Sequence, residues 1–125
     1  MPSHDVMPNM ELFQPTQVED ALSLADRFAE RGWLVGGGQD TYGWLKDRTK
    51  TTEALIDLSA ISSLRGIKET EDGLEIGALT TLSEIGGDLK IQRSYSLLSK
   101  AAEVVASPQI RNIGTIGGNI SQDVR

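Results

Sequence analysis

Three consecutive glycines at positions 36–38 directly follow the short apolar run Trp33-Leu34-Val35. Glycine has no Cβ, so such a segment can turn through backbone conformations that cost other residues about 1–2 kcal/mol each. A strand that enters a glycine turn and then a helix is typical of small parallel α/β units. The sequence therefore predicts a strand at 33–35, a turn at 36–40 and a helix that begins near Asp40.

Further elements of the same kind flank this turn. A short extended segment at 11–14 ends at Pro15. Thr16 and Glu19 have the spacing of a capping box, which predicts a helix over 18–29 with Gly32 as a left-handed stop. Residues 53–58 read as a second buried strand. Together these elements predict a parallel N-terminal unit.

The pattern changes after Ser59. Two β-rich runs, 66–70 and 74–77, flank Glu-Asp-Gly at 71–73, which predicts a hairpin because glycine tolerates the positive φ of the turn. Thr81 and Glu84 then form a second capping-box pattern, followed by a short helix that ends at Gly86-Gly87. The second half is thus expected to begin an antiparallel sheet.

A longer helix is predicted over 94–105, with Pro108 breaking it. Its expected buried face consists of Leu97, Leu98, Ala101, Val104 and Val105. The predicted fold class is therefore α+β: a small parallel α/β subdomain at 1–59, then at 60–125 the incomplete start of an antiparallel subdomain with helices.

Composition excludes several classes of function. The net charge of −6, without clustered basic residues, argues against nucleic acid as a partner. The absence of cysteine excludes disulfides, thiol catalysis and cysteine-ligated metal clusters in this chain. No signal peptide or membrane-spanning run is found, so a cytoplasmic protein without membrane association is expected. His4, the single histidine, is not expected to be catalytic.

The first glycine segment is a candidate anion site. Successive N–H groups in such a turn form a nest, and pyrophosphate is its natural occupant. The candidate residues are Gly36, Gly37, Gly38, Gln39 and Asp40. A dinucleotide fingerprint would need glycine where this chain has Thr41, and no P-loop lysine follows. The alternative is a tight strand-to-helix turn that binds no ligand.

A second glycine segment lies at 114–119. It combines Gly117 and Gly118 with the Thr115 hydroxyl and the Asn119 amide, which can hydrogen-bond phosphate or ribose oxygens. Its alternative interpretation is a β-bulge or a turn beside a strand. Neither glycine segment identifies a ligand on its own.

Three segments occur in order: Gly-Gly-Gly-Gln-Asp at 36–40, Ile-Gly-Ala-Leu-Thr-Thr at 76–81, and Ser-Pro-Gln-Ile-Arg-Asn-Ile-Gly-Thr-Ile-Gly-Gly-Asn at 107–119. Together they closely resemble the FAD-binding subunits or domains of molybdopterin-dependent hydroxylases of the xanthine dehydrogenase, aldehyde oxidase and carbon monoxide dehydrogenase type. The resemblance covers about residues 10–122, and the last motif is the most distinctive.

The resemblance implies FAD as cofactor, held in a cleft between the two subdomains. It implies that residues 36–40 and a second turn grip the FAD diphosphate, and that a strand lies alongside the flavin. The residues that match the second turn are Thr115, Gly117, Gly118 and Asn119, and those that match the strand are Gly77, Ala78 and Thr80.

The resemblance also implies partners. A large subunit would carry the molybdenum–pterin centre, and a small subunit would carry iron–sulfur clusters that pass electrons to this FAD. The electrons would leave to NAD, a quinone or oxygen. The chain shows no catalytic constellation and no metal-spaced ligands, so the flavin is expected to carry the chemistry. Family members continue past Arg125, so we expect this chain to be a truncated form.

Two alternatives stay open. The chain could be a non-catalytic fragment that serves as a scaffold or interface piece, or another flavoenzyme of the same fold, of the MurB or para-cresol methylhydroxylase type. The Ser-Pro-Gln-Ile-Arg-Asn segment favours the molybdenum group. Trp33, Tyr42 and Trp44 could stack on a flavin or adenine ring, but ordinary packing is the favoured interpretation.

Overall fold

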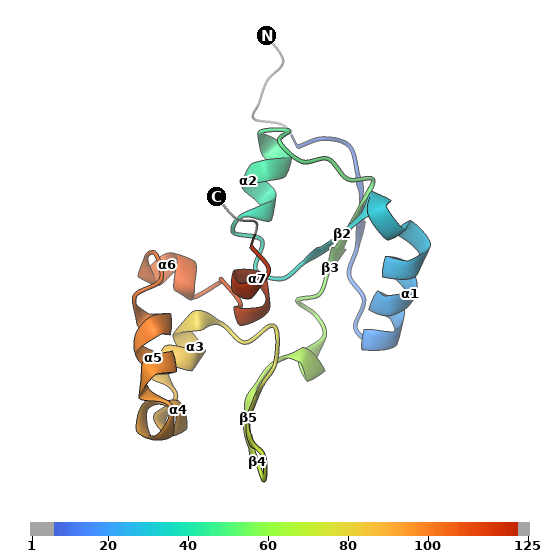
Figure 1. Cartoon of the computed structure of the whole chain (residues 1–125). Coiled ribbons are helices and arrows are strands. Elements are labelled where there is room, and N and C mark those ends of the chain that lie inside the picture. The colour runs from blue at the N-terminus through green and yellow to red at the C-terminus, as the bar shows by residue number, and fades with distance from the viewer. Residues whose placement is uncertain (1–6, 123–125) are drawn as a thin grey trace. The chain divides into compact units, whose positions relative to one another are not determined.

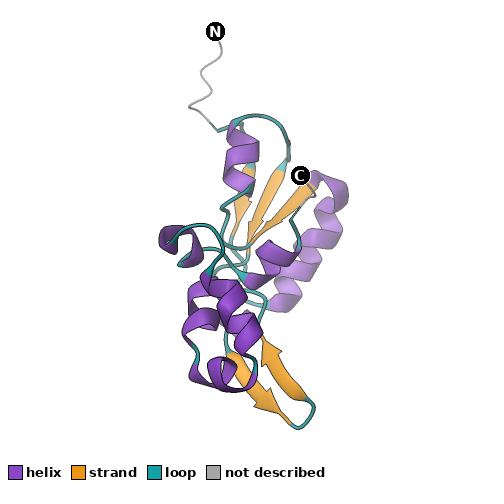
Figure 2. Ribbon diagram, turned by 60° about the vertical axis from the view of Figure 1, so that its left-hand side comes forward, coloured by secondary structure: helices purple, strands orange, loops and turns teal. Residues whose placement is uncertain are grey.

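The computed structural model describes residues 7–122, so His4 and the extreme termini lie outside the described residues. The chain divides between Ser62 and Ser63 into two compact units, whereas the sequence placed the boundary between 59 and 60. Figures 1 and 2 show the elements of each unit. Within residues 7–122, no helix combines the length and the apolar character that crossing a membrane requires.

The first unit is built on a parallel sheet of three strands, in the order β1-β3-β2. The central strand, β3 (Ala54–Asp57), pairs in parallel with β1 (Glu11–Phe13) and with β2 (Gly32–Val35). Helix α1 (Val18–Phe28) connects β1 to β2, and α2 (Thr41–Lys46) lies between β2 and β3. The predicted parallel α/β unit is confirmed.

Each face of this sheet has its own packing. Successive strand residues point to opposite faces, so Leu55 and Ile56 pack on different sides. On one side, Val35, Leu45 and Leu55 form a buried cluster with Met10 and Trp33 against it. The other side receives α1, whose Phe28 ring lies 5.2 Å from the ring of Phe13.

Helix α1 begins and ends differently from the prediction. Its N-cap is Gln17, with no side-chain cap, so the predicted capping box of Thr16 and Glu19 is wrong. The helix passes into a 3-10 turn, η1 (Ala29–Arg31), and Ala29 rather than Gly32 takes a positive φ, of 46°. Gly32 is extended and starts β2. A Cβ on Gly32 would lie 2.8 Å from that of Phe28, so packing requires this glycine.

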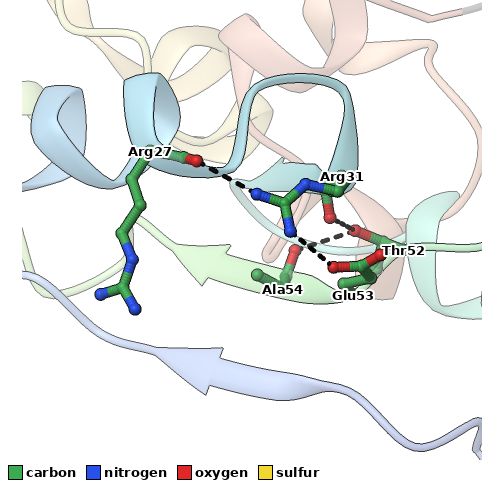
Figure 3. Close-up of polar contacts among 5 residues, drawn as sticks. All are labelled: Arg27, Arg31, Thr52, Glu53 and Ala54. Carbon is green, nitrogen blue, oxygen red and sulfur yellow. Dashed lines mark hydrogen bonds and ion pairs between the residues drawn. The ribbon is translucent and has the colours of Figure 1, made fainter.

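Polar contacts fasten the end of η1 to the start of β3 (Figure 3). The Arg31 guanidinium lies 3.0 Å from Glu53 Oε2, and the N–H of Glu53 donates to the carbonyl of Arg31 at 3.0 Å. The Thr52 hydroxyl lies 2.9 Å from the carbonyl oxygens of both Arg31 and Ala54. Both charged side chains are largely exposed, so the backbone contacts matter more here than the ion pair.

The second unit begins with a hairpin, which Figure 2 shows as two paired arrows. Strands β4 (Ile67–Thr70) and β5 (Gly73–Ile76) are antiparallel, and Gly73 has a φ of +140°. The predicted hairpin is therefore confirmed. A 3-10 turn, η2 (Ser62–Leu64), precedes it.

Short helices follow the hairpin. They are α3 (Leu82–Gly87), α4 (Leu89–Ser94), α5 (Ser96–Glu103), α6 (Pro108–Arg111) and α7 (Ile116–Ile120). Their core contains Ile85, Ile91 and Ala102, against which hairpin residues also pack. The capping box of α3 is confirmed: Thr81 Oγ1 accepts from the Glu84 N–H at 3.2 Å, and the Thr81 N–H donates to Glu84 Oε2 at 2.7 Å.

The predicted helix over 94–105 is wrong in extent and in orientation. Asp88 caps an earlier helix, α4, and the backbone breaks at Tyr95 before α5 begins. Leu97 and Val104 are 81% and 79% exposed, whereas Ser99 is buried. The Ser99 hydroxyl donates to the carbonyl of Gly86 at 2.9 Å, and Ala102 on the same side of α5 packs in the core, so this side faces inward.

Pro108 does not break this helix, since α5 already ends at Glu103. Instead it is the first residue of α6, where a missing N–H costs nothing. Ser107 caps α6 by accepting from the Ile110 N–H at 3.3 Å.

Candidate functional site

The first glycine segment lies between β2 and α2, as predicted. Gly38 is buried and has a φ of +78°, a conformation that favours glycine. Among residues 7–122, the N–H groups of Gly36, Gly37 and Gly38 find no hydrogen-bond acceptor. Buried backbone N–H groups are nearly always paired, so a buried, unpaired donor points to a missing acceptor. Three successive donors of this kind can hold an anion.

The residues that follow the glycines complete this turn. Gln39 is exposed. Asp40 occupies the N-cap position of α2 but does not cap the helix with its side chain. Tyr42 Cδ2 lies 2.7 Å from where a Cβ on Gly38 would stand, so the ring leaves room only for glycine there. The turn therefore offers mainly backbone donors.

The second glycine segment is helical rather than an open turn. Thr115 caps α7, with its hydroxyl accepting from the Gly118 N–H at 3.1 Å. The Ile116 N–H donates to Thr80 O at 2.9 Å, and the Gly117 N–H donates to Ala78 O at 2.8 Å. In this structure, the N–H groups of Gly114, Ile116, Gly117, Gly118 and Asn119 are paired internally, unlike those of the first segment.

The segment at 77–80 is not a strand, so that part of the prediction is wrong. Strand β5 ends at Ile76, and the chain then turns, with the Thr80 N–H donating to Gly77 O at 2.9 Å. Thr80 is 1% exposed, and its hydroxyl donates to Gly66 O at 3.1 Å and accepts from Gly66 N at 3.0 Å. A Cβ on Gly77 would overlap the carbonyl of Leu64. Both residues shape the fold locally.

The fold joins two of the three predicted segments within the second unit. Thr81 and Thr115 form an isolated antiparallel bridge, and the Leu82 N–H donates to Gly114 O at 3.0 Å. Together with the two bonds from Ile116 and Gly117, these contacts hold residues 78–82 against residues 114–117.

The two adjacent glycines of α7 differ in their surroundings. A Cβ on Gly117 would lie 2.8 Å from the carbonyl oxygen of Ala78, so the fold requires glycine there. A Cβ on Gly118 would meet only the Thr115 hydroxyl, at 3.1 Å, and Gly118 is exposed. Neither residue has a positive φ. Packing therefore explains Gly117, whereas Gly118 leaves an open surface where a ligand can approach the main chain.

Other chemistry is sparse in the described part of the chain. No group of His, Asp and Glu side chains there could hold a metal ion. Burial acts to raise the pKa of Asp57, but hydrogen bonds from Ser59 and Gln14 outweigh it and lower the pKa below 3.8. This carboxylate fastens the end of β3 to its neighbours. Trp33 and Trp44 pack edge to face, with centroids 6.2 Å apart, so they belong to the fold.

Comparison with known proteins identifies the family. The family model described as "FAD binding domain in molybdopterin dehydrogenase" matches residues 8–125. The chain belongs to this family. The family resemblance inferred from the three motifs is thereby confirmed, and FAD binding is the property for which the family is described.

Relatives and solved structures agree with this assignment. The chain is 35% identical to the carbon monoxide dehydrogenase medium chain of Hydrogenophaga pseudoflava over 93% of its length, and 36% identical to the nicotinate dehydrogenase FAD-subunit of Eubacterium barkeri over 92%. It spans 40% and 39% of those two proteins. It covers 40% of a chain in the solved carbon monoxide dehydrogenase of H. pseudoflava, with 36% identity over 92% of its own length and a TM-score of 0.89. The α+β fold class is thus confirmed.

Sequence reasoning missed several contacts of the site. The packing of Tyr42 on Gly38 was not predicted, although an aromatic four positions after a glycine at a helix start is a usable signal. The helix α7 was also missed. Threonine is a preferred N-cap residue, so Thr115 is the signal in the sequence that could have revealed this helix.

Proposed function

We propose that this chain binds FAD and that residues 36–40 are its principal diphosphate site. One observation carries the proposal: three successive glycine N–H groups, which include that of the buried residue Gly38, have no acceptor within residues 7–122. Phosphate oxygens are strong acceptors and match such a set of donors. Gln39 and Asp40 extend the same turn toward α2.

The second unit contributes through shape and side chains. Gly118 offers a surface without a Cβ, and the Asn119 amide beside it can bond phosphate or ribose oxygens. Thr115 caps the start of α7, and the absence of a Cβ at Gly117 allows α7 to pack against Ala78. Gly77 packs against Leu64 and Thr80 hydrogen-bonds to Gly66, which stabilises the turn that α7 contacts. We propose that Thr115, Gly117, Gly118 and Asn119 form the second contact with the cofactor.

The bound flavin would supply the redox chemistry, and the chain's own residues bind and orient it. We propose that the chain acts as an electron-transfer component of a molybdenum hydroxylase. Its relatives are named as a medium chain and as FAD subunits of dehydrogenases. Electrons would arrive from iron–sulfur clusters on a small subunit, after substrate oxidation on a molybdopterin-bearing large subunit, and leave to NAD, a quinone or oxygen.

A second candidate function is a folded scaffold or interface piece that binds no flavin. One observation favours it: the N–H groups of Ile116, Gly117, Gly118 and Asn119 are already paired within the second unit. The family match favours the molybdopterin group over other flavoenzymes of the same fold.

A titration of FAD with the full chain, followed by flavin fluorescence, separates the two functions. Saturable binding that ADP displaces and adenosine does not would place the affinity in the diphosphate. Gly118→Asp should abolish it, because a carboxylate would face the phosphates. Gly87→Asp is the matched control, since Gly87 is an exposed helix glycine with nothing near its Cβ position. Absence of binding by the wild-type chain would favour the scaffold function.

A further inference from the structure

Tyr42 lies against the first glycine turn in a way that the family assignment does not explain. It is the second residue of α2, and its N–H donates to Gly38 O at 3.2 Å. Its ring lies over Gly38: Cδ2 and Cζ are 2.7 and 2.9 Å from the position of a Cβ on that glycine, and Cε2 is closer still. The ring therefore covers one side of Gly38, a buried residue whose N–H has no acceptor within residues 7–122.

This contact restricts the most adaptable residue of the turn. A free glycine samples positive and negative φ about equally readily. With the Tyr42 ring in place, Gly38 is held at a φ of +78°. This torsion angle sets the direction of the peptide plane that carries the Gly38 N–H relative to helix α2, so the ring restricts the direction of that donor relative to the helix.

Tyr42 also differs from the other aromatic side chains of this unit. Trp33 and Trp44 contact each other, and Phe13 contacts Phe28. Tyr42 is 43% exposed, and within residues 7–122 its hydroxyl makes no hydrogen bond. Neither core burial nor the hydroxyl accounts for its place on Gly38, so its ring contact is its main structural role.

We propose that Tyr42 is a positioning residue that holds the turn at 36–38 in its anion-binding conformation before the ligand arrives. The ring, and not the hydroxyl, performs this task. The effect on ligand affinity rests on the function proposed above, whereas the effect on the free turn does not. If the released turn kept its binding conformation a tenth of the time, the apparent Kd would rise about tenfold.

The test compares Tyr42→Ala and Tyr42→Phe in the full chain, with Tyr95→Ala as control. Tyr95 is matched because it is 41% exposed and its hydroxyl oxygen lies 3.6 Å from the Cβ position of Gly73, another glycine with positive φ. Tyr42→Ala should raise the Kd for FAD and for ADP by about the same factor, near tenfold. Tyr42→Phe should restore wild-type affinity, and Tyr95→Ala should leave it unchanged.

Amide NMR of the free chain provides the second readout. Tyr42→Ala should lower the amide heteronuclear NOE of Gly36, Gly37 and Gly38, which reports mobility and does not depend on the ring current, and Tyr42→Phe should not. Unchanged glycine NOE values in Tyr42→Ala would overturn the proposal, as would a loss of affinity in Tyr42→Phe, which would show that the hydroxyl contacts the ligand. If the wild-type chain binds no FAD, the function proposed above fails, while the NMR comparison still decides the role of Tyr42.

Discussion

The adjacent glycines of α7 allow a sharp test of which residue serves the fold and which serves the ligand. We consider Gly117→Ala and Gly118→Ala, which add the same methyl group one residue apart in the same helix. In a helix interior, alanine is favoured over glycine by about 1 kcal/mol at either position. Any difference in stability between the variants therefore reports on their surroundings.

The structure predicts that Gly117→Ala lowers the free energy of unfolding and that Gly118→Ala does not. The new methyl of Gly117→Ala would lie 2.8 Å from Ala78 O, and forcing α7 away would weaken the bond from the Gly117 N–H to that oxygen. Overpacking costs about 1–3 kcal/mol and the lost hydrogen bond about 1 kcal/mol, which outweighs the helix preference. We expect a net loss of about 1–3 kcal/mol. The methyl of Gly118→Ala meets only the Thr115 hydroxyl, at 3.1 Å, and this tight contact offsets part of the helix preference. The stability of Gly118→Ala should therefore equal that of wild type or exceed it by less than about 1 kcal/mol.

Ligand binding should separate the same variants in the other direction. Gly118→Ala should raise the Kd for FAD about tenfold, equivalent to about 1.4 kcal/mol, although the fold of this variant is intact. Urea unfolding followed by circular dichroism measures stability, and flavin fluorescence measures affinity. If Gly118→Ala unfolds as easily as Gly117→Ala, or if Gly117→Ala is as stable as wild type, the argument from Cβ contacts is refuted.

Other predictions concern buried hydroxyls and surface charges. Thr80→Val should cost about 1–3 kcal/mol in urea unfolding, because the Gly66 N–H loses its acceptor, whereas Gly66 O keeps the N–H of Gly77; a change below about 0.5 kcal/mol would contradict this. The lowered pKa of Asp57 means that its contribution to stability is present above its unfolded pKa and is lost as the pH falls through its folded pKa. Stability of the wild type should therefore decline below about pH 4 more steeply than that of Asp57→Asn in acid titrations followed by circular dichroism. Arg31→Ala should cost less than about 1 kcal/mol at low salt and less still at high salt, because the pair with Glu53 is exposed; a larger loss in thermal unfolding would show that the Arg31 contacts are worth more than their exposure indicates.

Local signals predicted the parts of the fold that depend on neighbours in sequence. The hairpin follows from Gly73, and the start of α3 follows from Thr81 and Glu84. The parallel unit follows from apolar runs separated by a helix and a glycine turn. The hairpin and the start of α3 are determined within a few residues, and the order of strands, helix and glycine turn was sufficient to predict a parallel unit although its strands pair over long distances in the sequence.

Distant contacts decided the parts that were mispredicted. The apolar residues Leu97 and Val104 lie at helical spacing, yet the other side of α5, which carries Ser99 bonded to Gly86 O, faces inward. The run at 77–80 has strand-like composition, but Thr80 bonds to Gly66 instead of continuing β5. The two residues joined by each of these bonds are 13 and 14 positions apart in the sequence, so a local pattern cannot predict the bonds.

The candidate site shows the same division. The glycines at 36–38 and 117–118 were predicted as site residues from the sequence, but the sequence does not show which of them are required by packing. That distinction depends on Ala78 O for Gly117 and on the Tyr42 ring for Gly38. Only a structure shows that Gly118 has an open surface.

The contact between Gly117 and residue 78 has a consequence for how this protein can change in evolution. The group that forbids a side chain at 117 is a main-chain carbonyl, which every amino acid carries. Ala78 is itself exposed, so its side chain can be replaced while the carbonyl stays in place. One partner should then be nearly invariant while the other drifts. Methods that detect contacts from correlated substitutions would overlook this pair, although it fastens the C-terminal helix to the turn after the hairpin.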